Sequence, residues 1–215
     1  MARPSASTID RIVRILKKEY PSVKTALEHR SALDLLVATI LSAQCTDKRV
    51  NIVTKPLFQK YKKASDYAAA DTKVFENEIR STGFYRNKAK NIIAAARKIV
   101  KDFGGNVPDS MEELTSLPGV ARKTANIVLY GVFGKQEGIA VDTHVKRLSG
   151  RLGLTKQTDP VKIEQDLMKL VDRNDWGPFN FLLVEHGRAV CDARKPNCPG
   201  CVLAKLCPSF KVYTA

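Results

Sequence analysis

The stretch SMEELTSLPGVARKTANIV, residues 110–128, decides the fold around it. Ser110 and Glu113 have the spacing of a capping box, which predicts that a short helix begins here. Pro118 ends this helix because proline lacks the N–H that a helix interior needs, and Gly119 tolerates a positive φ. Apolar residues then recur at helical spacing. The stretch is therefore predicted to form two helices joined by a tight turn.

The beginning of the second helix, near Val120, is predicted to be an anion-binding site. The first N–H groups of a helix have no partner within the helix, and the helix dipole adds partial positive charge there. A DNA phosphate is the natural anion for such a place. Lys123 follows in the first turn and is a candidate amine nucleophile, the alternative being an ordinary solvated lysine.

The composition of the chain favours a polyanionic partner. Among 215 residues there are 36 Lys and Arg against 22 Asp and Glu, a net charge of +14. Such an excess indicates nucleic acid, with an inert basic surface as the alternative. No apolar run reaches the ~18 residues of a membrane helix, and the N-terminus resembles no secretory signal. We therefore expect a cytoplasmic protein without a membrane partner.

The apolar spacing predicts helices and no strand, so we expect an all-α fold. The run 33–41 is nearly all apolar and is expected to be the central core helix. Ser, Thr and Asp are the preferred helix N-caps. The expected caps of the helices outside the hairpin are Ser7 or Thr8, Ser31, Thr46 or Asp47, Ser65, Asp71, Asp142 or Thr143, and Asp159.

Other helix boundaries are predicted from prolines and glycines. The helix that follows Thr46 is expected to close near Pro56. A long helix is expected from about Asn87 to the glycine pair at 104–105, and the last helix from about Pro178.

Four cysteines close the chain with the spacing C-x6-C-x2-C-x5-C: Cys191, Cys198, Cys201 and Cys207. In a cytosolic chain such a cluster indicates metal rather than disulfides. Four thiolates suit either zinc or an iron–sulfur cluster, and spacing alone does not separate the two. The fifth cysteine, Cys45, is far away in sequence and is interpreted as a buried small apolar residue.

The motif LPGVARKTAN, the later VDTHVKR at 141–147 and the cysteine spacing together resemble the endonuclease III family of helix-hairpin-helix DNA glycosylases. The resemblance extends over nearly the whole chain, from about Ile12 to Cys207. It implies two helical domains with a DNA cleft between them. Residues 25–136 would form a six-helix barrel that contains the hairpin. Residues 1–24 and 137–215 would form a discontinuous domain that ends in the cysteine loop.

The resemblance also implies an activity. The chain would be a bifunctional DNA glycosylase and abasic-site lyase of base excision repair, acting as a monomer on oxidised pyrimidines or abasic sites in duplex DNA at the nucleoid. Lys123 would be the nucleophile and Asp142 the second catalytic residue, although Asp142 also suits a simple helix N-cap. The alternatives are an abasic-site lyase, a mismatch glycosylase of the same superfamily, and a non-catalytic DNA-binding module.

The resemblance further implies a [4Fe–4S] cluster on the four cysteines and a set of DNA contacts. Gln44 and Phe84 would fill the space left by an extruded base, and Phe84 stands where the family has leucine. We interpret His144 as structural or close to a DNA phosphate, and His186 as a core residue. The remaining DNA contacts would come from the hairpin and from the loop between the first two cluster cysteines: Leu117, Gly119, Val120, Ala121, Arg194 and Lys195.

Overall fold

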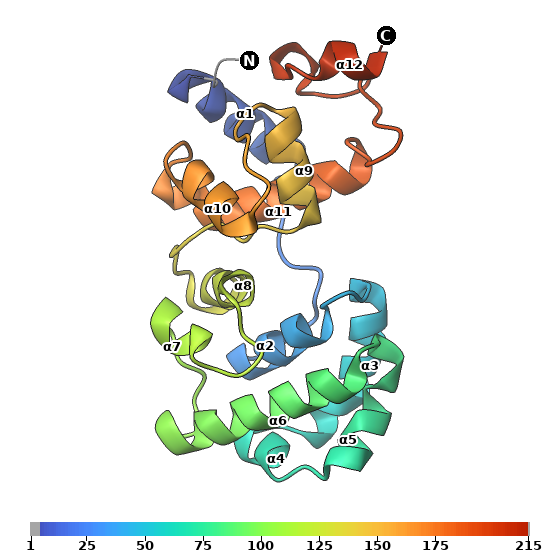
Figure 1. Ribbon diagram of the computed structural model, residues 1–215, viewed down its shortest axis with the longest axis vertical. Coiled ribbons are helices and arrows are strands. Elements are labelled where there is room, and N and C mark those ends of the chain that lie inside the picture. The colour runs from blue at the N-terminus through green and yellow to red at the C-terminus, as the bar shows by residue number, and fades with distance from the viewer. Residues whose placement is uncertain (1–4, 215) are drawn as a thin grey trace. The chain divides into compact units, whose positions relative to one another are not determined.

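The computed structural model describes residues 5–214, and within this range it is all-α, with no β-strand, as the sequence predicts (Figure 1). None of the described helices is long and apolar enough to cross a membrane. The chain divides into two compact units. One is Thr25–Lys135, and the other consists of the described parts of Met1–Lys24 and Gln136–Ala215.

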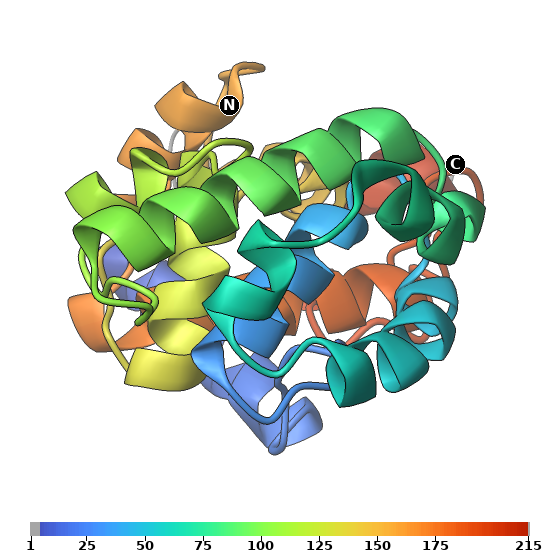
Figure 2. The same ribbon diagram turned by 90° about the horizontal axis from the view of Figure 1, so that it is seen from below.

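The unit Thr25–Lys135 is built around α2 (Ala32–Leu41), the predicted core helix. Ser31 caps it, because the Ser31 hydroxyl accepts the N–H of Asp34 at 3.1 Å. All residues of α2 from Asp34 onward are buried. Three helices contact α2 (Figures 1 and 2): α3 (Asp47–Lys60), α6 (Tyr85–Asp102) and α8 (Arg122–Phe133). Burial of this nearly all-apolar helix is therefore a large stabilising contribution in this unit.

Three short helical segments precede α6 and contact it: α4 (Ala64–Ala68), α5 (Thr72–Glu78) and the 3-10 turn η1 (Arg80–Thr82). Segments of this length are not stable alone and need tertiary packing. An aromatic cluster supplies it, since the Tyr61 and Tyr67 rings stack at 4.9 Å and the ring of Phe75 stands edge-on to both. Burial raises the pKa of the Tyr67 hydroxyl.

The predicted hairpin consists of α7 (Met111–Thr115), a turn and α8. Leu117 and Val120 are both buried, and the Val120 N–H donates to the Leu117 carbonyl at 3.1 Å. Between them, Gly119 has a φ of 78°, and a Cβ there would lie 2.7 Å from the Cβ of Asn91 on α6. Glycine is thus required twice, for its backbone angle and for the close approach to α6.

The second unit contains its own apolar core, formed mainly by α1 (Ala6–Glu19), α9 (Thr143–Arg151) and α11 (Trp176–Ala189). The helix α11 contacts both α1 and α9. The other elements are α10 (Pro160–Met168), η2 (Arg173–Asp175), η3 (Ala204–Leu206) and α12 (Phe210–Thr214).

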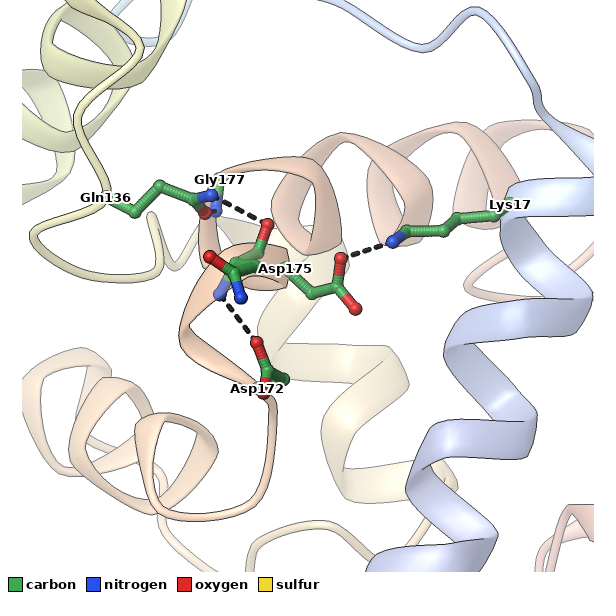
Figure 3. A network of polar contacts seen from close by, with 6 residues as sticks. Lys17, Gln136, Asp172, Asp175 and Gly177 are labelled. Carbon is green, nitrogen blue, oxygen red and sulfur yellow. Dashed lines mark hydrogen bonds and ion pairs between the residues drawn. The ribbon is translucent and has the colours of Figure 1, made fainter.

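A polar network holds the beginning of α11 (Figure 3). The Gln136 side chain donates to the Asn174 carbonyl at 2.7 Å and accepts the Gly177 N–H at 2.9 Å. Lys17 of α1 pairs with Asp175 at the start of the same helix. The amide contacts fix the backbone here, whereas the solvent-accessible ion pair contributes little to stability.

The expected end of α3 near Pro56 is wrong: the helix continues through this proline to Lys60. Proline at this position removes one backbone hydrogen bond. The turn that follows it carries Leu57 and Phe58, both buried against the core. Burying these two side chains stabilises the last turn by more than the lost hydrogen bond costs.

Two expected N-caps are displaced, whereas Ser31, Thr46, Asp71, Asp142 and Asp159 cap as predicted. The cap of α1 is Ser5, whose hydroxyl accepts the Thr8 N–H at 3.3 Å. The helix α4 begins after Lys63 rather than at Ser65, because the Asp66 carboxylate reaches back to the Lys63 N–H at 2.9 Å. The carboxylate of a residue inside the helix thus accepts the N–H of Lys63, the residue that precedes the helix.

The two roles of Gly119 are separable by substitution. Gly119→Ala and Gly134→Ala both place alanine at a positive φ, 78° and 66°, which costs about 1–2 kcal/mol. At Gly134 an added Cβ meets no atom within 4 Å, whereas at Gly119 it meets Asn91. We expect Gly119→Ala to lower the free energy of unfolding by about 1–3 kcal/mol more than Gly134→Ala in urea titrations. Equal losses in the two variants would show that the contact with Asn91 has no energetic role.

Candidate active site, DNA contacts and cluster site

Lys123 is exposed in the first turn of α8, directly after the hairpin turn. The N-cap of this helix is Ala121, and no side chain caps α8 from that position. An alanine offers no oxygen to the first N–H groups, so the positive end of the helix stays available for an anion. The amine of Lys123 thus lies beside a helix N-terminus that is suited to bind a phosphate.

The four hairpin residues predicted to contact DNA fall into two kinds. Gly119 and Ala121 are exposed. The side chains of Leu117 and Val120 are buried and belong to the core of the unit. These two buried side chains anchor the turn, so the DNA contact predicted for this pair would be made by the backbone.

Asp142 is the N-cap of α9, with its Oδ1 accepting the Val145 N–H at 2.8 Å. The carboxylate is half-buried. One oxygen is thus engaged with the helix, which fixes the direction of the carboxyl group. Lys123 belongs to the unit Thr25–Lys135 and Asp142 to the other unit.

His144, two residues beyond Asp142, is half-buried and contacts an arginine. Its Nδ1 lies 3.1 Å from a guanidinium nitrogen of Arg147, which also donates to the Cys191 carbonyl. Burial lowers the pKa of the imidazole, so the neutral form that accepts from arginine is favoured. On the facing helix a Cβ at Gly187 would lie 2.6 Å from the same Nδ1, which explains the glycine there.

Gln44 and Phe84 share an uncommon backbone conformation. They are the two non-glycine residues with positive φ in the described part of the chain, at 52° and 47°. Both are exposed, and two thirds of the Phe84 surface is accessible to solvent. Left-handed backbone costs about 1–2 kcal/mol for such residues and is found where surrounding structure imposes it. The two predicted gap-filling residues thus stand on strained loop positions.

The four C-terminal cysteines line one cavity, together with Arg151 and Asn197. Each cysteine is free and half-buried. Four thiols around one cavity suit either zinc or an iron–sulfur cluster as ligands.

Arg151 fixes the first cysteine of this ring. Its guanidinium donates to the carbonyls of Asp192 and Ala193 at 2.6 and 2.8 Å, and to the sulfur of Cys191 at 3.3 Å. The ring of Tyr213 lies over the same guanidinium, 4.4 Å from its centre. Sequence reasoning missed Arg151 because its partners lie about 40 and 62 residues away along the chain.

A side chain of α11, that of His186, contacts one of the four C-terminal cysteines. The imidazole of His186 is buried between the Tyr20 hydroxyl at 3.0 Å and the sulfur of Cys201 at 3.4 Å. Burial raises the pKa of the thiols of Cys201 and Cys207, so the neutral thiol is favoured until a cation binds.

The loop between Cys191 and Cys198 presents two basic side chains. Arg194 and Lys195 are exposed, and their N–H groups donate to the Asp192 carboxylate at 2.8 and 3.1 Å. These bonds lower the pKa of Asp192, that from Lys195 most. The loop is thus shaped by its own aspartate, which leaves the basic side chains in solvent.

Cys45 lies in the other unit, half-buried against its core rather than fully buried as expected.

Comparison with known proteins agrees with the resemblance inferred from the motifs. The family model of HhH-GPD superfamily base excision DNA repair proteins matches residues 37–173. An endonuclease III of Synechocystis sp. is 61% identical over 198 residues, which are 92% of this chain and 90% of that protein. A solved non-covalent endonuclease III–DNA complex matches with a TM-score of 0.92 and 41% identity, over 97% of this chain and 98% of that one.

A structure of a trapped endonuclease III–DNA covalent intermediate matches equally well, with a TM-score of 0.92, 41% identity and the same coverage of both chains. The chain therefore belongs to the endonuclease III family, within the HhH-GPD superfamily of base excision DNA repair proteins.

Proposed function

We propose that this protein removes oxidised pyrimidines from duplex DNA through a Schiff base on Lys123 and then nicks the strand by β-elimination. As a member of the endonuclease III family the chain is a base excision repair DNA glycosylase and abasic-site lyase. The observation that carries the proposal is the exposed amine of Lys123 in the first turn of α8, beside a helix start that its N-cap leaves uncapped. A non-catalytic DNA-binding module would use the hairpin only to bind phosphate, which does not account for the occurrence of Asp142 together with Lys123.

The chemistry begins with attack of the Lys123 amine on C1′ of the damaged nucleotide. The bond from C1′ to the base breaks, and the base leaves with the electron pair and takes up a proton. The sugar ring then opens as the nitrogen lone pair forms a C=N bond. Loss of a proton from C2′ expels the 3′ phosphate, and water finally hydrolyses the imine and frees the lysine. The covalent endonuclease III–DNA intermediate of a 41% identical relative supports this route.

Asp142 has the second role in the proposal. Positive charge develops on the sugar as the base departs, and a carboxylate stabilises that charge and assists proton transfers. The bond from the Val145 N–H to one oxygen of Asp142 holds the carboxyl group in one orientation. Capping α9 and serving the reaction are therefore compatible, because the cap orients the group that the reaction uses.

The DNA contacts divide into phosphate binding and gap filling. We assign phosphate binding to the backbone at the start of α8 and to the exposed side chains of Arg194 and Lys195. We assign gap filling to Gln44 and Phe84, because a base drawn out of the stack leaves a space that an exposed side chain must occupy. The amine and the basic loop then act on one double-stranded DNA partner that carries a damaged base or an abasic site.

We further propose that Cys191, Cys198, Cys201 and Cys207 hold a [4Fe–4S] cluster. The cavity that they line supports this assignment. The cluster would supply a covalent staple for a segment whose elements, η3 and α12, are too short to be stable alone. Arg151 and His186 orient two of the ligands from outside.

Lys123→Gln should abolish nicking of an abasic-site duplex while the dissociation constant for the same duplex changes by less than about tenfold, since one exposed charge is worth about 1 kcal/mol or less. The measurement pairs a nicking assay with fluorescence anisotropy. The matched control is Lys101→Gln, which removes an exposed charge from α6 of the same unit and should nick normally. Nicking by Lys123→Gln at the wild-type rate would remove this lysine from the mechanism.

Cys198→Ser should remove the visible absorbance of an iron–sulfur cluster and lower the melting temperature, because the C-terminal segment loses its staple. Cys45→Ser is the matched control and should keep both properties, since Cys45 packs in the other unit. Metal analysis of wild-type protein should find iron and sulfide in equal amounts. Zinc without sulfide would contradict the assignment.

A further inference from the structure

Lys88 is a charged residue inside the core of the unit Thr25–Lys135. It lies near the beginning of α6 and has only 5% of its surface exposed. Its ammonium group donates to two backbone carbonyls, that of Leu41 at 2.7 Å and that of Thr82 at 2.8 Å. Burial lowers the pKa of this lysine, so the fold works against its charge. A buried cation without a carboxylate among its bonded partners is costly, and such positions are commonly functional.

The two carbonyls stand at the roots of two loops. Leu41 is the last residue of α2, and the chain reaches Gln44 three residues later. Thr82 is the last residue of η1, and Phe84 follows after one glycine. Lys88 also donates its own N–H to the Phe84 carbonyl at 3.1 Å. One residue therefore fastens the Phe84 loop at both sides and ties it to the end of α2.

The backbone strain in these two loops lies at Gln44 and Phe84, close in sequence to the carbonyls that Lys88 binds. Gln44 and Phe84 have the left-handed backbone, and both side chains point to solvent rather than into the core. Neither conformation persists unless the surroundings impose it. The carbonyl of Leu41 is one of those that α2 cannot satisfy itself, and the negative end of the helix dipole favours a cation there. The Lys88 ammonium thus supplies the constraint that the strained loops need.

We propose that Lys88 is a positioning residue that holds the Gln44 and Phe84 loops in one fixed arrangement, so that both side chains are ready to fill the gap left by an extruded base. The inference rests on the proposed function and deepens it, since Lys88 is buried and would act through the two loops. The conformational entropy of ordering the two loops is then lost during folding rather than each time the protein binds damaged DNA.

The alternative is that Lys88 merely stabilises the fold, and a mutant cycle separates the two roles. Lys88→Met keeps the length of the side chain and removes the donors. It should lower the single-turnover rate of thymine glycol excision at saturating enzyme by about tenfold or more, because misplaced loops slow the step that follows binding. In a Gln44→Ala and Phe84→Ala background the same change should lower the rate by less than about twofold, because nothing is left to position.

Ile99→Val is the control for stability, since Ile99 is buried on the same helix and its truncation costs about 1 kcal/mol. It should excise at the wild-type rate in both backgrounds. Equal effects of Lys88→Met with and without Gln44 and Phe84, or a rate equal to that of Ile99→Val, would overturn the inference. If Lys88→Met fails to fold, Lys88→Gln takes its place in the cycle. The glutamine side chain keeps a hydrogen-bond donor but is shorter than that of lysine. Absence of excision by wild-type enzyme would instead refute the proposed function.

Discussion

The hairpin turn depends on one constraint, the contact of Gly119 with Asn91 of α6. Buried Leu117 and Val120 hold the turn from either side, and the glycine lets the backbone approach α6 without a Cβ in between. The direction in which α8 begins follows from this packing. This packing therefore also positions the first turn of α8, which contains Lys123 and the proposed phosphate-binding N–H groups. The close approach of Gly119 to α6 thus defines where the proposed chemistry would take place.

Both units use a cation to hold irregular backbone. In one unit the Lys88 ammonium binds the carbonyls of Leu41 and Thr82. In the other the Arg151 guanidinium binds carbonyls of the segment that follows the first cluster cysteine. Loops cannot satisfy their carbonyls through regular hydrogen bonds, and a long cationic side chain offers several donors at one point. The loops to which we assign functions are therefore held by side chains of the neighbouring helices.

Features that depend on neighbours in sequence could be predicted. The caps at Ser31, Thr46 and Asp142 each involve a side chain and an N–H three residues later, so spacing alone reveals them. The Lys123 motif and the cysteine spacing are equally local, and they pointed to the family that the comparisons confirm. Features that depend on tertiary packing could not be predicted. Continuation of α3 past Pro56, burial of the Leu117 side chain and the part played by Lys88 all follow from partners distant in sequence.

The central claim is that the Lys123 amine becomes covalently joined to the sugar of the damaged nucleotide. Borohydride reduces a Schiff base to a stable amine, so peptide mapping of the trapped complex identifies the residue directly. With a thymine glycol duplex we expect a covalent protein–DNA product whose modified peptide contains Lys123. Attachment at another lysine, or tight binding with no covalent product, would contradict it.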